Sequence, residues 1–269
     1  MEKRAKYPAG VGEIAPGVLY PDEHATIVDL DRRVPGPAVA RFVEFYWHVR
    51  WNTAEPYETK VLSHPNVHLV FETPSPQVYG VDRNLFVRRL HGRGQVLGVK
   101  FRAGCFRPFT GRPVIALADR RVPAREFFGP AVDEVNRAVL GTTDLDAMAD
   151  LAEAFLRPRL PAPDPAAEEV AAMAGRMTAD PALFRVDDAA EMLHVSVRTL
   201  QRLFAEYVGA SPKWVLRRAR LHEAAARADR GDGVDWASLA ADLGYCDQSH
   251  LTRDFTAVVG VSPARYARS

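Results

Sequence analysis

The sequence contains very little cysteine and no long apolar run. Its two cysteines, Cys105 and Cys246, lie far apart, which excludes the disulfide framework of a small secreted domain. No stretch reaches the roughly 18 consecutive apolar residues that a membrane-spanning helix requires. The first residues, MEKRAKYPAG, lack the apolar core of a signal peptide. These absences predict a cytoplasmic protein with reduced thiols and no membrane partner.

Net charge is also close to zero. The chain has 35 basic and 34 acidic side chains, which give +1 at pH 7, so the total charge does not predict a polyanionic partner. The distribution is uneven, however. Residues 197–230 carry eight basic and three acidic side chains, whereas residues 231–269 carry three and five. Any contact with a polyanion is therefore expected to depend mainly on the first of these two segments.

Motifs of catalysis are missing as well. The sequence has no glycine-rich phosphate loop and no nucleophile elbow. His64 and His68 would lie about 13 Å apart on a strand, too far to share one metal ion. Cys105 has no neighbouring cysteines to complete a metal site, and we favour a buried structural cysteine over a reactive or redox-active thiol. We predict no catalytic residue, no metal and no cofactor, and we expect that the protein is not an enzyme.

A proline-rich segment divides the chain into two domains. Four prolines stand within residues 158–167, where they remove backbone donors and hold the chain extended. Residues 1–157 form the expected N-terminal domain, β-rich to about residue 112 and helical over 113–157. Runs such as VHLVFE (67–72) and QVLGVKF (95–101) predict a small antiparallel β-barrel or sandwich. Asp144 is a candidate cap for a helix in the second half.

Residues 168–269 read as an all-α domain of about seven helices, so the fold class is α+β. Helix starts are predicted at Asp187 or Asp188, at Ser196 and at Asp247, whose side chains suit N-caps. Gly209 and Gly260 suit helix ends. Pro212 suits the first turn of a longer helix that ends near Ala228.

This C-terminal part contains the same unit twice, 51 residues apart and without a gap. LQRLFAEYVGASP (200–212) matches LTRDFTAVVGVSP (251–263) at the leucine, arginine, phenylalanine and glycine and at the Ser-Pro pair, and Ala190 matches Ala241. Each copy predicts a short helix, a tight turn and a capped second helix, which is a helix-turn-helix. Leu200 with Phe204, and Leu251 with Phe255, are four residues apart and share the buried face.

The opposite face of each second helix carries side chains that suit DNA. Arginine pairs with guanine and glutamine with adenine through two hydrogen bonds each, and the helix start offers N–H groups to a phosphate. A helical scaffold with solvated arginines is the alternative interpretation. The candidates are Arg198, Gln201 and Arg202 in the first copy and Gln248, Ser249, His250 and Arg253 in the second.

Residues 166–269 resemble the DNA-binding domain of the AraC/XylS family of transcription regulators. The residues that carry the resemblance are SVRTLQRLFAEYVGASP, KWVLRRARLHEAA and LAADLGYCDQSHLTRDFTAVVGVSPARY. The resemblance implies two helix-turn-helix units joined by one long helix, with the seven residues above reading DNA. It implies double-stranded operator or promoter DNA as the partner, with RNA polymerase and a second copy of the chain as further candidates, and leaves activation and repression open.

The helix predicted from Pro212 to Ala228 would be about 25 Å long. Such a strut would set two recognition helices into successive major grooves, as a dimer with a spacing of about 34 Å does. Glu206, Asp229 and Asp254 are expected to be solvated. Arg217, Arg218 and Arg220 are expected to contact either phosphate or neighbouring side chains.

The N-terminal domain resembles that of one AraC-type subgroup, over FVEFYWHVRW, HPNVHLVFE and GVKFRAGCFRPFTGRPVIALADRRVP. The resemblance implies a domain that senses or dimerises. Three functions follow: a regulator that responds to a small-molecule effector, a regulator controlled by a protein partner or by its abundance, and an enzyme with an attached DNA-binding domain. A β-rich domain with aromatic side chains suits a small-molecule pocket, although the same residues suit an ordinary core. The candidate effector-binding residues are Trp47, His68, Phe71, Lys100 and Phe106.

Overall fold

The computed structural model describes residues 17–180, 183–230 and 233–268. Its N-terminal half is built on one six-stranded antiparallel sheet with the strand order β1-β2-β5-β3-β4-β6, preceded by the short helix α1 (Pro21–Ile27). The strands are β1 (Val28–Arg33), β2 (Val43–Val61), β3 (His68–Phe71), β4 (Gln77–Tyr79), β5 (Phe86–Phe101) and β6 (Arg121–Pro123). The predicted antiparallel domain is confirmed, but the sheet extends to Pro123 rather than ending near residue 112.

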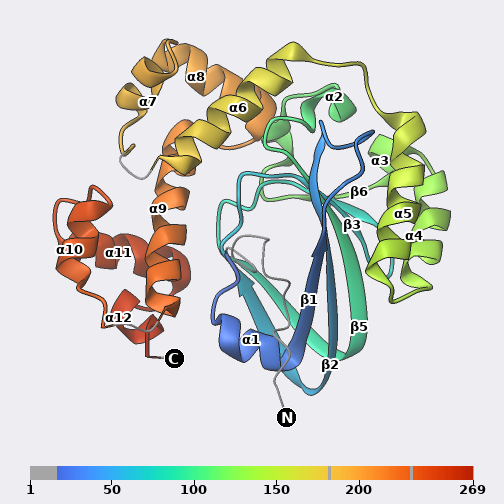
Figure 1. Ribbon diagram of the computed structural model, residues 1–269, viewed down its shortest axis with the longest axis horizontal. Helices are drawn as coiled ribbons and strands as arrows, with labels where there is room; N and C mark the ends of the chain where they lie inside the picture. The colour runs from blue at the N-terminus through green and yellow to red at the C-terminus, as the bar shows by residue number, and fades with distance from the viewer. Residues whose placement is uncertain (1–16, 181–182, 231–232, 269) are drawn as a thin grey trace.

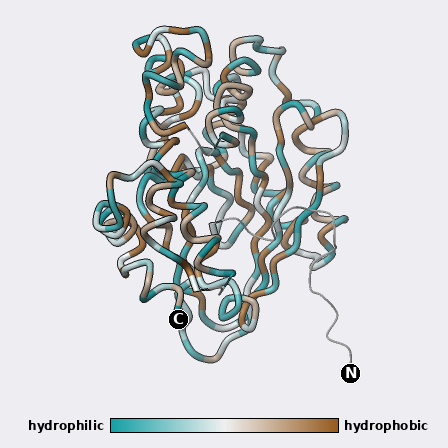
Figure 2. The backbone as a smooth tube through the Cα atoms, turned by 60° about the vertical axis from the view of Figure 1, so that its left-hand side comes forward, coloured by the Kyte–Doolittle hydropathy of each residue, from teal (hydrophilic) through white to brown (hydrophobic). Residues whose placement is uncertain are grey.

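The long strands β2 and β5 form the centre of this sheet, and their side chains alternate between its two faces. One face presents Tyr46 from β2 and Leu97, Val99 and Phe101 from β5 to the main hydrophobic core. On the other face, Trp47 from β2 and residues of the neighbouring strands line a cavity. Figure 2 shows apolar stretches gathered along the strands in the middle of the molecule.

A helical layer covers the first face. It contains α2 (Arg107–Thr110), a 3-10 turn η1 (Val114–Leu117), α3 (Arg125–Phe128), α4 (Ala131–Leu140) and α5 (Leu145–Leu156). Figure 1 shows α4 and α5 side by side along the sheet, on the side away from the C-terminal helices. The predicted cap of α5 is confirmed, because the Asp144 carboxylate accepts a hydrogen bond from the backbone N–H of Asp146.

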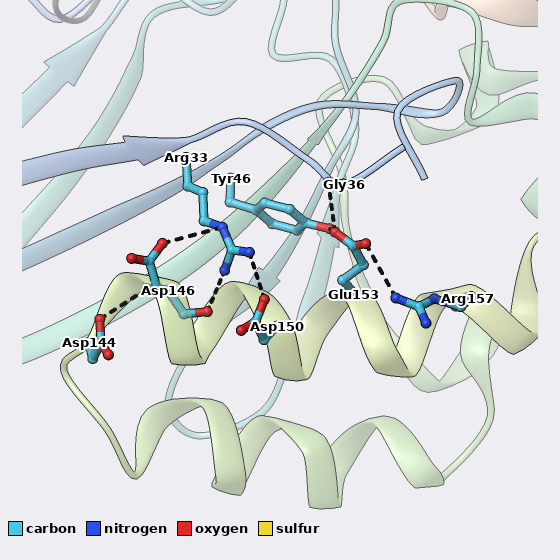
Figure 3. Close-up of polar contacts among 8 residues, drawn as sticks. All are labelled: Arg33, Gly36, Tyr46, Asp144, Asp146, Asp150, Glu153 and Arg157. Carbon is cyan, nitrogen blue, oxygen red and sulfur yellow. Dashed lines mark hydrogen bonds and ion pairs between the residues drawn. The ribbon is translucent and has the colours of Figure 1, made fainter. Parts of the chain in front are cut away.

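Polar contacts fix α5 to the first strands (Figure 3). The Arg33 guanidinium forms an ion pair with Asp150 at 2.6 Å and another with Asp146 at 3.3 Å. The largely buried Glu153 accepts hydrogen bonds from the backbone N–H of Gly36 at 2.9 Å and from the Tyr46 hydroxyl at 3.4 Å. The sheet and its helical layer are thereby joined by both apolar and charged contacts.

The described residues of the C-terminal half form seven α-helices, as predicted. A 3-10 turn η2 (Arg157–Arg159) leads into α6 (Pro165–Ala179), α7 (Val186–Met192) and α8 (Val197–Leu203), which a π-helical turn η3 (Phe204–Val208) extends. The remaining helices are α9 (Pro212–Asp229), α10 (Trp236–Asp242), α11 (Gln248–Val259) and α12 (Pro263–Tyr266). Figure 1 shows α9 running between the α7–α8 pair and the α10–α11 pair, along the face of the sheet opposite α4 and α5.

Helix caps follow the sequence with one exception. Ser196 and Asp247 accept backbone hydrogen bonds at the starts of α8 and α11, as predicted, and Ser211 does the same at the start of α9. The prediction that Asp187 or Asp188 caps α7 is wrong. The N-cap is Arg185, and both aspartates lie in the first turn. Their negative charges stabilise the helix there, because the N-terminal end of the helix dipole is positive.

The two halves contact each other through specific groups. The backbone carbonyl of Arg83, between β4 and β5, accepts hydrogen bonds from Trp214 Nε1 at 3.1 Å and from the Arg218 guanidinium at 2.8 Å. Arg107 forms an ion pair with Glu206. None of the helices in the described ranges is long and apolar enough to cross a membrane.

Candidate DNA-reading helices and effector cavity

The first helix-turn-helix unit exposes the three side chains that the sequence singled out. Leu200 and Phe204 are fully buried against the neighbouring helices, and this burial fixes the orientation of α8. Arg198, Gln201 and Arg202 lie exposed on the other side. The hydroxyl of Ser196 caps the helix by accepting the N–H of Thr199 at 3.1 Å. The start of α8 can therefore meet a groove of DNA with its side chains unobstructed.

The second unit repeats this arrangement in α11. Leu251 and Phe255 are fully buried, and Gln248, Ser249, His250 and Arg253 are exposed. Two of the four are held by neighbours. The His250 ring packs edge-on against Tyr245, with ring centroids 5.1 Å apart, and Arg253 Nε donates to the carbonyl of Ser249 at 3.4 Å. The DNA-reading side chains of α11 thus make more contacts within the protein than those of α8.

The helix α9 connects the two units, and its 18 residues give it a length of about 27 Å. Its arginines are largely engaged within the protein. Arg217 forms an ion pair with Asp254 of α11 at 2.6 Å, Arg218 is 2% exposed, and the Arg220 guanidinium lies 4.6 Å from the centre of the Tyr245 ring. All three arginines thus contact neighbouring groups of the protein, and their contact with phosphate stays a prediction.

The expectation that Glu206, Asp229 and Asp254 are merely solvated is wrong. Glu206 pairs with Arg107, Asp229 accepts a hydrogen bond from the Tyr266 hydroxyl at 2.8 Å, and Asp254 accepts one from the Tyr245 hydroxyl at 2.8 Å besides its pair with Arg217. Counting charges along the sequence therefore overstates both the cations available for phosphate near α9 and the acidity of the second unit.

A cavity of about 180 Å³ lies on the face of the sheet that the helical layer leaves uncovered. Its floor is aromatic because two tryptophans of β2 lie over two glycines of β5. Trp47 pairs with Gly98 and Trp51 with Gly94. A Cβ atom at Gly98 would lie 1.9 Å from the Trp47 ring, and one at Gly94 would lie 2.2 Å from the Trp51 ring. The indoles can lie across the sheet only because these positions have no side chain.

Hydrogen bonding fixes the Trp47 ring and the protonation of its neighbour. Trp47 Nε1 donates to His68 Nδ1 at 3.0 Å, so His68 is neutral and carries its proton on Nε2. Burial and the nearby Lys100 ammonium lower the pKa of His68 to about 3. Across the strand pair, Lys100 Nζ donates to Glu44 at 3.0 Å and lies 4.7 Å from the centre of the Phe45 ring. Burial also lowers the pKa of Lys100.

Three of the five predicted effector-binding residues line this cavity: Trp47, His68 and Lys100. The prediction is wrong for Phe71 and Phe106, which are fully buried in the hydrophobic core beneath the helical layer. Phe71 is three residues from His68 on one strand and therefore points to the opposite face. Phe106 follows the end of β5 and packs edge-on against Phe101, with ring centroids 4.9 Å apart.

Other residues of the cavity wall were not predicted from the sequence. Phe45 and Trp51 share the period of two with Trp47 along β2, and Arg32, Phe86 and Arg88 complete much of the lining. The signal was present in the spacing: Trp47 and Trp51 are four residues apart, as are Gly94 and Gly98. Antiparallel pairing places each tryptophan ring over a glycine. The sequence spacing alone does not give this pairing, because it depends on the strand register.

A larger cleft of about 650 Å³ separates the sheet from α9 and adjoins the cavity. Val18, His24, Leu30 and His64 line both spaces. At this junction the His64 ring stacks on His222 of α9, with ring centroids 4.0 Å apart and planes 10° from parallel. Burial, with the neighbouring His64, lowers the pKa of His222 well below its usual value. His64, which lines the cavity, thus contacts the helix that joins the two recognition units directly.

No group of three or more His, Cys, Asp or Glu side chains within the described ranges is arranged to hold a metal ion. His64 lies outside the strand that contains His68. Cys105 is buried, and desolvation raises its pKa to about 11, which keeps the thiol protonated and supports the structural interpretation of this residue. Cys246 is exposed.

Comparison with known proteins identifies the C-terminal domain. Residues 189–269 match the family model described as a helix-turn-helix domain, and residues 31–123 match a domain of unknown function, DUF6597. The C-terminal domain is a helix-turn-helix domain of the AraC type, which is a DNA-binding domain. No curated protein matches the chain significantly.

Solved structures of ToxT from Vibrio cholerae are similar to this chain at low levels. A 1.65 Å structure of ToxT has a TM-score of 0.41 at 10% identity, and the match covers 90% of this chain and 97% of ToxT. The unsaturated fatty acid-bound form has a TM-score of 0.36 at 12% identity and covers 90% and 94%. At these values the likeness does not bear on function.

Proposed function

We propose that the chain is a DNA-binding transcription regulator that responds to a small-molecule effector bound in the cavity of the N-terminal sheet. The observation that carries the proposal is the position of the cavity, which shares four lining residues with the cleft beneath α9. An occupant of the cavity that shifts His64 also changes the stack on His222. Because α9 joins α8 and α11, this contact can alter how the two recognition helices are presented to DNA.

The shape of the cavity favours this function over control by abundance or by a protein partner alone. A sheet domain that binds nothing small is expected to fill its interior, since protein cores are close-packed. Here two glycines instead leave a flat aromatic floor, and His68 and Lys100 stand in its wall. Aromatic surfaces with a few placed polar groups are typical of small-molecule sites. The proposal includes no catalytic activity.

The DNA site follows from the exposed residues of α8 and α11. We propose that Arg198, Gln201 and Arg202 read one major-groove segment and that Gln248, Ser249, His250 and Arg253 read the next. Selecting genomic fragments of the source organism with the purified chain, followed by sequencing, would give the operator. A reporter gene placed behind that operator then measures the regulatory response in cells.

Filling the cavity tests the effector. Val49 lies between Trp47 and Trp51 on the lining face of β2, and Val49→Phe would occupy much of the space. We expect the variant to bind the operator but to lose its response to growth conditions that change reporter expression. Val87→Phe makes the same change at a position that is 47% exposed and should leave the response intact. A Val49→Phe response identical to that of the unaltered chain would contradict the proposal.

A further inference from the structure

Two polar side chains of the cavity wall, His68 and Lys100, offer hydrogen-bond donors. His68 uses Nδ1 to accept from Trp47, so its remaining ring nitrogen carries a proton, and no described residue accepts it. Lys100 has three N–H donors and gives one to Glu44. His68 and Lys100 are directly paired across β3 and β5, which places their side chains next to each other on one face. The two residues together offer several hydrogen-bond donors to one acceptor group in the cavity.

The carboxylates near the cavity do not oppose this arrangement. Asp82, in the lining, forms an ion pair with Arg121 at 2.8 Å. Glu72 forms one with Arg88 at 2.7 Å. The side chain of Glu44 is 39% exposed, whereas that of its partner Lys100 is 8% exposed. The ammonium is thus the buried member of its pair, and Glu44 is its one acceptor among the hydrogen bonds of the described residues.

The apolar part of the cavity fits a flat group. The indoles of Trp47 and Trp51 lie over bare backbone at Gly98 and Gly94, and the Phe45 ring stands beside them. Aromatic rings favour offset-stacked or edge-on contacts with other rings. The volume of about 180 Å³ is close to the roughly 150 Å³ of a cavity that accommodates benzene. One ring with a small substituent fills such a space.

We propose that the effector is a single-ring, planar compound that bears a carboxylate. Its ring lies on the indoles of Trp47 and Trp51, and its carboxylate accepts hydrogen bonds from Lys100 Nζ and His68 Nε2. Charge-assisted bonds of this kind are the strong ones in a protected site. The inference rests on the proposed function and specifies the chemistry of its ligand.

Isothermal titration calorimetry on the purified full-length chain tests this chemistry with three probes of one shape. Benzoate is the anionic probe, benzamide the neutral one and benzylammonium the cationic one. We expect benzoate to bind about tenfold more tightly than benzamide and benzylammonium to bind least. Lys100→Met should weaken benzoate by about tenfold and leave benzamide within a few-fold. Glu44→Gln removes the competing carboxylate and should tighten benzoate.

Lys60→Met is the matched control. Lys60 lies on β2 between Thr59 and Val61, which line the cavity, so its own side chain points to the other face. It should leave all three affinities unchanged. Tightest binding of benzamide or benzylammonium, or a benzoate affinity that Lys100→Met does not change, would overturn the anionic class. Binding of none of the three would overturn it too. The proposed function would still stand in either case if Val49→Phe abolished the reporter response.

Discussion

At the scale of single residues, Arg202 is the side chain on which DNA reading depends most directly. It is exposed on α8, on the face opposite the buried Leu200 and Phe204. We expect Arg202→Ala to weaken operator binding by about 1–3 kcal/mol and to relax base preference at one position. Binding assays across a set of single-base operator variants measure both effects. A uniform loss across all variants would show that Arg202 contacts phosphate rather than a base.

Gly98 carries a different residue-scale prediction, because it supports the cavity floor. A Cβ there would lie 1.9 Å from the Trp47 ring, so Gly98→Ala must displace the indole from its bond with His68. We expect the free energy of unfolding to fall by about 1–3 kcal/mol, measured by urea denaturation. Gly175→Ala is the control, because a Cβ at Gly175 of α6 meets nothing within 4 Å. It should be neutral or stabilising by up to about 1 kcal/mol. Equal effects of the two changes would contradict this account of the floor.

At the scale of elements, the contact between α9 and α11 determines how the second recognition helix is held. Asp254 of α11 binds both Arg217 of α9 and the Tyr245 hydroxyl. We expect Asp254→Ala to destabilise the domain by about 1–3 kcal/mol, because it leaves a hydroxyl and a half-buried guanidinium without their acceptor. Asp242→Ala removes a more exposed partner of Arg227 and should cost no more than about 1 kcal/mol. Thermal denaturation of the two variants makes the comparison, and a larger loss from Asp242→Ala would refute it.

The sequence predicts the helical elements well and the two faces of the sheet poorly. Caps such as Ser196 and Asp247, and glycines such as Gly209, act locally, so the repeat could be assigned helix by helix. Which face of the sheet a residue joins depends on strand register, a long-range property. Phe71 therefore lies on the opposite face from His68 although the two belong to one strand. Asp254 was misjudged for the same reason, since its partner Arg217 is 37 residues away.

At the scale of the whole molecule, buried histidines make the fold sensitive to acid. Burial lowers the pKa values of His24, His48, His68 and His222 below the usual 6.5. The unfolded chain therefore binds more protons than the native one below about pH 6.5. The stability that these groups contribute is fully present above that pH, and it decreases as pH falls from about 6.5 toward their lowered native values.

We expect the free energy of unfolding to fall between about pH 7 and pH 5, and His222→Phe to reduce that fall by about 1–2 kcal/mol. Phenylalanine keeps a ring on His64 but does not titrate. His91→Gln, which changes an exposed histidine, is the matched control. Urea denaturation across this pH range measures the effect. A stability that is flat with pH, or an unaltered slope in His222→Phe, would contradict the role given to burial.

The central claim is that one chain reads two successive major grooves, with α8 binding more strongly than α11. Arg198 and Arg202 are exposed on α8, whereas Arg253 of α11 bonds back to the carbonyl of Ser249, and cationic contacts supply much of the affinity for DNA. Hydroxyl-radical footprinting of the full-length chain on its selected operator tests this most directly. We expect two protected segments on one face of the DNA, about one helical turn apart. Arg202→Ala should weaken the protection of both segments, and Gln248→Ala should weaken the protection of the second segment only. A single protected segment that no change in α11 affects, or the same protection on unselected DNA, would contradict the claim.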